Sequence, residues 1–301
     1  MTNLKNKSLV SINDLTKKEI LDIINTAKRF KDGLIKSSLT NKVIASCFFE
    51  HSTRTRMSFE AAIAKLGGKT IGFADSSSTS LAGKGESLID TLKIISEYAN
   101  LLILRHPLDG TARLASDICN IPIINAGDGA NQHPTQTLLD LFSIEDSQGS
   151  LEGISLGIMG DLKYNRTVHS LITAAQLFSM KLFFISPPSL RLDEESLFKL
   201  KCSGIKYSFH QAPEQVIDQL DCLYMTRLQK ERFNRETHDE YKISLSLLNN
   251  AKDNLKILHP LPRMEELPPE IDNSKFAYYF TQAKNGLYVR QALLDMILGE
   301  N

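Results

Sequence analysis

The sequence predicts an α/β protein with two doubly wound domains, each built on a parallel sheet. Short apolar segments of strand length alternate with segments whose apolar residues recur at helical spacing, which is typical of parallel sheets wrapped by helices. The alternation forms two series, and the polar stretch Ser147 to Ser150 separates them. Polar or basic residues also follow several predicted strands directly. We therefore expect one domain at residues 1–147 and a second at residues 148–285.

The composition indicates a globular protein whose partners are not selected by bulk charge. The chain has 301 residues, enough for two domains of ordinary size, and 42% of them are hydrophobic. Lysine plus arginine and aspartate plus glutamate both total 35, so the formal net charge is zero. This balance argues against nucleic acid or a membrane surface as a partner. No apolar signal segment opens the sequence, so we expect a cytoplasmic protein.

The cysteine and histidine spacings predict neither a metal site nor a cofactor. No histidine or cysteine spacing matches a metal-binding motif, and no glycine-rich nucleotide fingerprint follows a predicted strand. The cysteines lie far apart without C-x-x-C spacing, as is typical of reduced, mostly buried thiols in a cytosolic protein. They are Cys47, Cys119, Cys202 and Cys222.

The elements of the first series follow in order along the chain. A capping box at Thr16 to Glu19 opens a helix that Gly33 ends. An apolar run predicts a strand at residues 43–49, and the helical pattern after it ends at Leu66, before a Gly-Gly pair. Residues 75–86 are rich in serine, threonine and glycine and predict a mobile loop. The remaining elements are a helix at 87–98, strands at 101–104 and 121–124, and a helix opened by His133 and Pro134.

The second series contains elements of the same kind. Ile154 to Met159 is expected to form a buried strand, followed by a helix at 167–178. An apolar helix at 286–298 is expected to close the chain. Further strands are expected at 181–185, 205–209, 222–226 and 257–258.

Polar and basic clusters stand directly after predicted strands in both series. Ligands of open α/β sheets bind at the carboxyl ends of the strands, so this placement predicts a binding site at each sheet. Random loop residues would not be expected to gather repeatedly at these ends. The clusters are Ser52 to Thr55, Arg105, Asp161 to Arg166, Arg227 and His259 to Arg263.

The cluster Ser52-Thr53-Arg54-Thr55 lies where the strand at 43–49 gives way to a helix. Backbone N–H groups and the helix dipole favour an anion at such a junction. The hydroxyl groups add donors, and an arginine fork can grip a phosphate. Taken alone, the cluster could be a capping serine with surface arginines, but its context favours an anion site.

The stretch Phe48 to Glu60 closely resembles the carbamoyl-phosphate signature of the aspartate and ornithine carbamoyltransferase family. The likeness extends over nearly the whole chain. Three further stretches resemble the aspartate branch of that family: Gly160 to Ser170, Thr226 to Arg232 and His259 to Pro262. Ornithine-specific members carry a cysteine after that histidine, whereas this chain has Pro260.

The resemblance implies a transferase reaction in which an amine attacks the carbonyl of carbamoyl phosphate and phosphate leaves. The protein would bind the phosphate, stabilise a developing oxyanion and hold the amine in line, which needs no metal. The first domain would bind carbamoyl phosphate and the second aspartate, with the active site between them and at the subunit interface. The C-terminal helix, residues 286–301, would pack back on the first domain. Transfer to aspartate is the committed step of pyrimidine biosynthesis.

The expected carbamoyl-phosphate site adds residues from other strand ends to the anion cluster. Arg105 could reach the phosphate or the carbonyl oxygen. His133 stands at a helix N-terminus, where its charged form is disfavoured, and as a neutral imidazole it could donate to that oxygen. Gln136, one turn on, could meet the carbamoyl amide. The resemblance implies that Arg54, Thr55, Arg105 and His133 are catalytic and that the site comprises Ser52, Thr53, Arg54, Thr55, Ser80, Lys84, Arg105, His133, Gln136, Pro260 and Leu261.

The acceptor is expected to carry two carboxylates. Arg166 and Arg227 follow strands of the second series, and each can take one carboxylate as a bidentate pair. Aspartate has two carboxylates, whereas ornithine has one and a side-chain ammonium. Either arginine alone could form a surface salt bridge, but the pair favours a dicarboxylate. The resemblance adds Lys84 and Gln229 to the aspartate site, and implies that Ser80 and Lys84 reach into the neighbouring site of a homotrimer.

Two alternatives to this function stay open from the sequence. Another transcarbamoylase, such as an ornithine carbamoyltransferase, would use a different acceptor, against which Pro260 and the arginine pair argue. A non-catalytic relative that serves as a binding chain would be marked by loss of Arg54, Arg105 or His133, and all three are present. A regulatory chain is a further candidate partner, but no residue in the sequence shows whether one binds.

Overall fold

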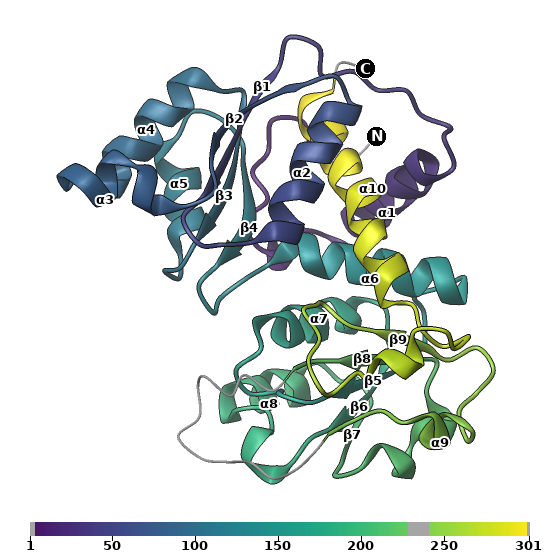
Figure 1. The fold of residues 1–301 in the computed structure, drawn as a ribbon. Coiled ribbons are helices and arrows are strands. Elements are labelled where there is room, and N and C mark those ends of the chain that lie inside the picture. The colour runs from purple at the N-terminus through teal and green to yellow at the C-terminus, as the bar shows by residue number, and fades with distance from the viewer. Residues whose placement is uncertain (1–3, 228–240, 300–301) are drawn as a thin grey trace. The chain divides into compact units, whose positions relative to one another are not determined.

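The structure is a computed structural model that describes residues 4–227 and 241–299. Within these ranges β-strands alternate with α-helices, and the strands pair in parallel in two separate sheets (Figure 1). The predicted class, an α/β protein with two parallel sheets flanked by helices, is confirmed. In this described part of the chain, no helix has both the length and the apolar character that crossing a membrane requires.

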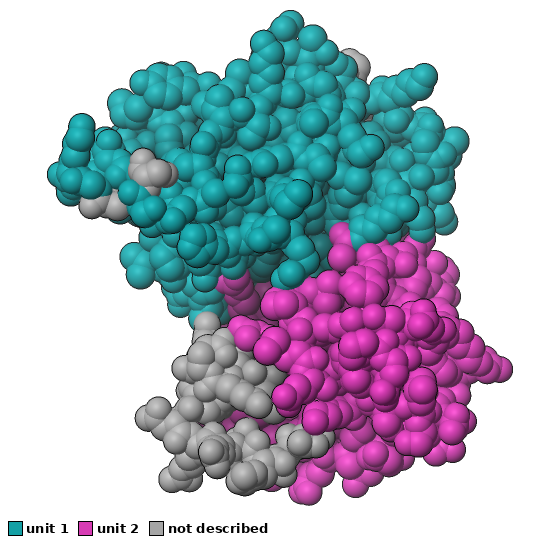
Figure 2. All heavy atoms as spheres, viewed as in Figure 1, with its two compact units in different colours: residues 1–142, 284–301 teal, residues 143–283 magenta. Residues whose placement is uncertain are grey.

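The chain divides into two compact units (Figure 2). Unit 1 contains residues 1–142 and 284–301, and unit 2 contains residues 143–283. The chain passes between them inside two helices, α6 (Pro134–Gln148) and α10 (Tyr279–Leu298). The division falls inside α6, a few residues before the boundary that the polar stretch Ser147 to Ser150 suggested.

Unit 1 is built on a sheet with helices on both faces. In spatial order its strands are β2 (Lys69–Phe73), β1 (Val43–Phe48), β3 (Leu101–His106) and β4 (Ile123–Asp128). Helices on one face include α4 (Leu88–Tyr98) and α5 (Thr111–Ile118), and the other face carries α1 (Lys17–Lys31), α2 (Thr53–Lys65) and part of α10 (Figure 1). Strand β1 is buried along most of its length, as a continuous apolar run in a parallel sheet requires, whereas the edge strand β2 is largely exposed.

The strand order of unit 1 creates a topological switch point between β1 and β3. After β1 the chain continues to β2 on one side of it, and then returns to β3 on the other side. The crevice at the carboxyl ends of two such strands is the usual ligand site of an open α/β sheet. Residues 50–55 follow β1, and Arg105 and His106 end β3, so the predicted anion cluster and Arg105 belong to this switch point.

Unit 2 has the same construction. In spatial order its strands are β7 (Tyr207–His210), β6 (Lys181–Ile185), β5 (Ser155–Met159), β8 (Cys222–Met225) and β9 (Lys256–Leu258). Its helices include α7 (Arg166–Leu177), α8 (Glu194–Cys202) and α9 (Leu245–Leu248). Strand β5 is buried at every position and has β6 on one side and β8 on the other, so this unit has its switch point between β5 and β8.

The segment 75–86, predicted as a mobile loop, is instead partly helical. A capped turn at Asp75, whose carboxylate accepts from the backbone N–H of Ser77 at 2.9 Å, leads into a short helix, α3 (Ser80–Lys84). Gly85 ends this helix in the left-handed region, with φ 72°. Serine, aspartate and glycine are typical of helix caps as well as of loops, which is why their density was misleading.

The strand predicted at 121–124 was also placed wrongly, because β4 extends to Asp128. All six residues of β4 are buried, including polar ones. The amide of Asn125 donates to the carbonyl oxygen of Val10 at 2.9 Å and to the carboxylate of Asp128 at 2.8 Å. Its own oxygen accepts from the backbone N–H of Gly127 at 2.8 Å. The partner from outside the strand, Val10, is distant in sequence, so the polar residues gave no sign that the strand continues.

The helix expected at 286–301 begins earlier, since α10 runs over Tyr279–Leu298. Residues 300 and 301 lie outside the described residues. Strand β2 and helices α5 and α8 were not predicted, although each forms in the structure. The exposed strand β2 lacks the continuous apolar run that marked the buried strands, because it lies at an edge of its sheet.

Candidate active site

The N-terminus of α2 offers backbone donors that no side chain caps. Ser52 occupies the N-cap position with an extended backbone, but its hydroxyl makes no capping hydrogen bond. By contrast, Ser87 caps α4, accepting from the N–H of Asp90 at 3.1 Å. The first turn of α2 holds no acidic residue and contains Arg54. This helix end therefore presents N–H groups, hydroxyls and a guanidinium, a combination suited to a phosphate.

Arg105 stands at the neighbouring strand end and is held in place from two sides. Its guanidinium donates to the carbonyl oxygen of Ala126 at 3.1 Å and forms an ion pair with Glu50 at 2.8 Å. Its side chain is only 11% exposed. Burial lowers the pKa of Arg105, the carboxylate of Glu50 opposes that shift, and the charge of Arg54 adds to it. Two arginines thus share one positive region, where a dianion would relieve their mutual repulsion.

A hydrogen-bonded loop positions His133 at the start of α6. Asp128 accepts from the backbone N–H groups of Gly110 at 3.0 Å and Gln132 at 3.1 Å. His133 follows and is only 5% exposed, with Nδ1 lying 3.4 Å from the hydroxyl oxygen of Thr135. The imidazole is therefore fixed by its surroundings at a helix N-terminus, as the sequence predicted.

In unit 2 a close backbone contact joins the two strand ends of the switch point. Gly160 directly follows β5 and has φ 115°. A Cβ atom at this position would overlap the carbonyl oxygen of Thr226. The hydroxyl of Thr226 accepts from the backbone N–H of Asp161 at 3.0 Å. Because Thr226 directly precedes Arg227, and the Gly160 turn leads to Arg166, this one contact helps to place both arginines.

Arg166 and Arg227 are each half-buried at the ends of neighbouring parallel strands. Arg166 is the first residue of α7, which Asn165 caps by accepting from the N–H of Thr167 at 3.1 Å. The two arginines therefore follow the carboxyl ends of two neighbouring strands. Gln229, the third residue expected to bind aspartate, lies outside the described residues.

The loop after β9 is fixed by His259, which is only 2% exposed. Its Nε2 atom lies 2.9 Å from Glu266, and its Nδ1 atom accepts from the backbone N–H of Leu261 at 2.8 Å. Leu261 has φ 56°, a left-handed conformation that this hydrogen bond supports. Burial raises the pKa of Glu266, but hydrogen bonds from His259 and from the N–H of Met264 outweigh it and lower that pKa overall.

The predicted residues Ser80 and Lys84 lie on α3 and not on the strand ends that carry the anion cluster and Arg105. Both are exposed. Lys84 makes no ion pair with any residue of the described ranges. Figure 1 shows α3 at the margin of unit 1, beyond α4. The ammonium group of Lys84 is therefore accessible to a ligand or to another chain.

Four structural partners of these residues were missed from the sequence. Glu50 pairs with Arg105, and Asp128 orders the loop before His133. Thr226 joins two strand ends, and Glu266 fixes His259. Glu50 and Thr226 had a signal that could have been used, since they lie inside the stretches Phe48 to Glu60 and Thr226 to Arg232. No sequence pattern marked Asp128 or Glu266.

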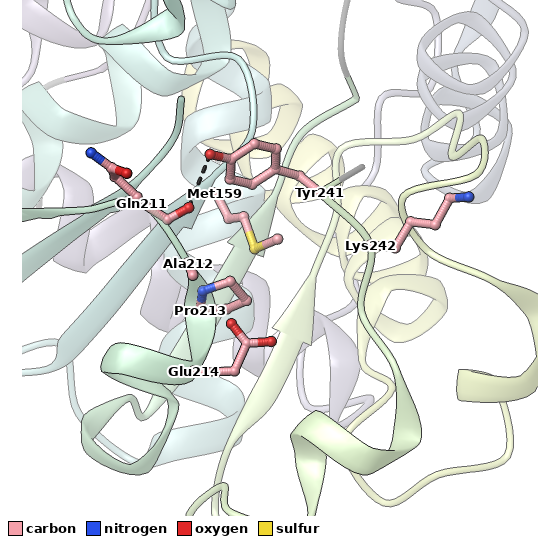
Figure 3. Close-up of a pocket in the computed structure, with 7 residues that line it drawn as sticks. All are labelled: Met159, Gln211, Ala212, Pro213, Glu214, Tyr241 and Lys242. Carbon is pink, nitrogen blue, oxygen red and sulfur yellow. Dashed lines mark hydrogen bonds between the residues drawn. The ribbon is translucent and has the colours of Figure 1, made fainter. Parts of the chain in front are cut away.

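A cavity of about 250 Å³ lies elsewhere in unit 2, near the ends of β5 and β7. Figure 3 shows the ring of Tyr241 over it, with its hydroxyl donating to the carbonyl oxygen of Gln211 at 2.9 Å. None of its lining residues belongs to the predicted site. Across the described residues, no cluster of three or more His, Cys, Asp or Glu side chains is arranged to hold a metal ion.

The fold and these sites together define a class of protein. Residues 7–146 match the carbamoyl-phosphate-binding domain of the aspartate/ornithine carbamoyltransferases, and residues 152–297 match the aspartate/ornithine-binding domain. The chain belongs to the aspartate/ornithine carbamoyltransferase family. The resemblance noted in the sequence is thereby confirmed.

Individual relatives come from the aspartate branch of the family. The aspartate carbamoyltransferase catalytic subunit of Wigglesworthia glossinidia brevipalpis is 53% identical over 307 residues, covering 100% of this chain and 99% of the relative. Catalytic subunit 2 of the Shewanella halifaxensis enzyme is 50% identical over 303 residues, covering 99% and 98%.

Solved structures show the same likeness. The catalytic subunit of M. jannaschii aspartate transcarbamoylase has a TM-score of 0.90 and 44% identity, and the match covers 96% of both chains. Aspartate transcarbamoylase from Trypanosoma cruzi, in complex with carbamoyl phosphate and aspartate, has a TM-score of 0.91 and 34% identity, covering 98% of this chain and 96% of that one.

Proposed function

We propose that this protein transfers the carbamoyl group from carbamoyl phosphate to the amine of L-aspartate, giving N-carbamoyl-L-aspartate and phosphate. The proposal rests chiefly on the placement of cationic groups at both switch points. Uncapped helix donors with Arg54 and Arg105 suit a dianionic phosphate, and the pair Arg166 and Arg227 suits a dicarboxylate. The reaction is a step of pyrimidine biosynthesis.

In unit 1, the proposed roles follow from what each side chain can donate. Ser52, Thr53, Arg54 and Thr55 bind the phosphate, and Arg54 neutralises charge on the leaving group. Arg105 reaches the phosphate or the carbonyl oxygen. His133 donates to that oxygen, and Gln136 contacts the carbamoyl amide. Because these donors are already held by the fold, little reorganisation is needed as charge develops.

In unit 2, Arg166 and Arg227 bind the two carboxylates of aspartate, with Gln229 as a further contact. Lys84, from unit 1, also contacts aspartate. Pro260 and Leu261, in the loop that His259 orders, contribute to carbamoyl-phosphate binding. The amine of aspartate is the nucleophile, so this scheme requires no nucleophilic side chain.

We further propose a cytoplasmic homotrimer in which Ser80 and Lys84 of one subunit serve the site of its neighbour. The exposed position of Lys84, which makes no ion pair within the described part of its own chain, supports this arrangement. A regulatory chain is a further candidate partner, because relatives of this chain are named as catalytic subunits.

Replacing Arg227 by alanine is expected to raise the KM for aspartate by roughly 10- to 100-fold, the loss of one charged hydrogen-bonded pair. The KM for carbamoyl phosphate should change little. Lys199→Ala is a suitable control, since Lys199 is an exposed cation on α8 that pairs with Glu195 at 2.6 Å. Unaltered aspartate saturation in the Arg227 variant would remove that residue from the acceptor site.

Phosphate release from carbamoyl phosphate by the purified chain tests the function itself. Release should require an acceptor and should be far faster with L-aspartate than with L-ornithine. Faster release with ornithine would favour the alternative transcarbamoylase. No acceptor-dependent release from a folded protein would favour a non-catalytic binding chain.

A further inference from the structure

The side chain of Gln136 is oriented by a carboxylate one turn further along α6. Its amide nitrogen donates to Oδ1 of Asp140 at 2.8 Å, and Asp140 is completely buried. An ionised carboxylate can only accept hydrogen bonds, so the amide must turn its nitrogen toward Asp140. The amide oxygen of Gln136 is then left to accept from a ligand.

A buried arginine accompanies this carboxylate. Arg290, on α10, is only 3% exposed and interacts electrostatically with Asp140. Burial lowers the pKa of Arg290 to about 10, and the charge of Asp140 opposes this shift. The side chain therefore stays protonated at neutral pH and places a positive charge near Asp140. Neither residue has a role in the reaction described above.

The guanidinium of Arg290 lies close to α2. The guanidinium carbon lies 4.9 Å from the ring centre of Phe59, a fully buried residue of α2. On α10 itself, Gly286 leaves room for it, because a Cβ atom there would overlap the guanidinium. A glycine inside a helix is less favourable than alanine, so the space it leaves is the evident benefit.

We propose that Asp140 is a positioning residue that fixes the amide of Gln136 with its oxygen toward the amine of the carbamoyl group. This inference rests on the proposed function and deepens it. The carbamoyl amine offers N–H donors, so the fixed amide oxygen is complementary to it. If Asp140 could donate, the Gln136 amide could turn over and present its own N–H groups, which cannot accept from that amine.

Acetyl phosphate provides a probe for this orientation. It has a methyl group where carbamoyl phosphate has an amine, and it keeps the phosphate and the carbonyl oxygen. A correctly held Gln136 should therefore favour carbamoyl phosphate, whereas residues that bind the phosphate should affect both ligands equally. The ratio of the two dissociation constants reports on contacts to the carbamoyl amine, among them the amide of Gln136.

The experiment compares this ratio, together with kcat and thermal unfolding, in the full chain and its variants. Asp140→Asn should lower the preference for carbamoyl phosphate about tenfold and leave acetyl phosphate binding almost unchanged. Gln136→Ala should show the same loss of preference. Asp117→Asn, on the exposed side of α5, serves as the matched control and should keep the preference of the wild type.

A double variant separates positioning from stability. Asp140→Asn alone leaves Arg290 buried without its counter-charge and can destabilise unit 1. Asp140→Asn with Arg290→Met removes both charges, so it should fold more stably than the single variant and still lack the preference. If the double variant recovers the preference for carbamoyl phosphate, or if carbamoyl phosphate and acetyl phosphate weaken in parallel, Asp140 has only a structural role and the proposal is wrong. Absence of carbamoyl transfer in the wild type would instead refute the proposed function.

Discussion

Replacement of Arg54 by alanine is expected to lower kcat by roughly 100- to 1000-fold, the usual effect of removing one donor to charge that develops in the transition state. Arg54 lies in the first turn of α2, where no acidic side chain competes for it. Negative charge on the leaving phosphate grows as the bond to the carbonyl breaks, so the loss should appear in kcat as well as in KM. Steady-state kinetics with both substrates measure the two effects.

Arg56→Ala is the matched control for this experiment. Arg56 is the same residue type on the same helix, but it pairs with Glu60 at 2.7 Å along the helix surface. Such pairs contribute only about 0.3–0.5 kcal/mol to stability, and no role in the reaction is proposed for this one. The control should keep nearly full activity. An Arg54 variant with a normal kcat would contradict the proposed contact with the leaving group.

Mixing two inactive variants should restore activity if neighbouring subunits share their sites. Arg54→Ala and Lys84→Ala should each be nearly inactive alone. In a ring of three, each site takes Arg54 from one chain and Lys84 from the next, so every mixed trimer has one site with both residues intact. When equal amounts of the two variants reassemble at random, about three quarters of the trimers contain both variants. Roughly a quarter of all sites are then active.

The measurement is the specific activity after the trimers are dissociated, mixed and reassembled. Each variant treated alone in the same way is the control and should remain inactive. If both residues served the site of their own chain, every site would keep one defect. No recovery from reassembled trimers would therefore show that Lys84 does not act in the neighbouring site.

The parts of this structure that could be predicted from the sequence are those with local signals. The capping box predicted at Thr16 forms, with the N–H of Glu19 donating to the Thr16 hydroxyl at 3.2 Å. Buried parallel strands such as β5 were found because both of their faces are apolar. The clusters after these strands pointed to the switch points, since a strand end is visible in the sequence even when its neighbours in the sheet are not.

What could not be predicted depends on partners that are far apart along the chain. Asn125 extends β4 because its amide bonds to Val10, which no local pattern could reveal. Likewise, Asp140 and Arg290 are ordinary charged residues in helical segments until the fold buries them together. The glycines and serines around Lys84 indicated a loop, but Ser80 and Gly83 lie inside a short helix that Gly85 ends.

The most direct measurement is the fate of the carbonyl carbon of carbamoyl phosphate. With ¹³C at that position, the purified chain and L-aspartate should convert the substrate signal into that of N-carbamoyl-L-aspartate, followed by nuclear magnetic resonance. Equal amounts of inorganic phosphate should appear. Label that stays in carbamoyl phosphate, or that moves to ornithine in preference to aspartate when both are present, would contradict the proposed function.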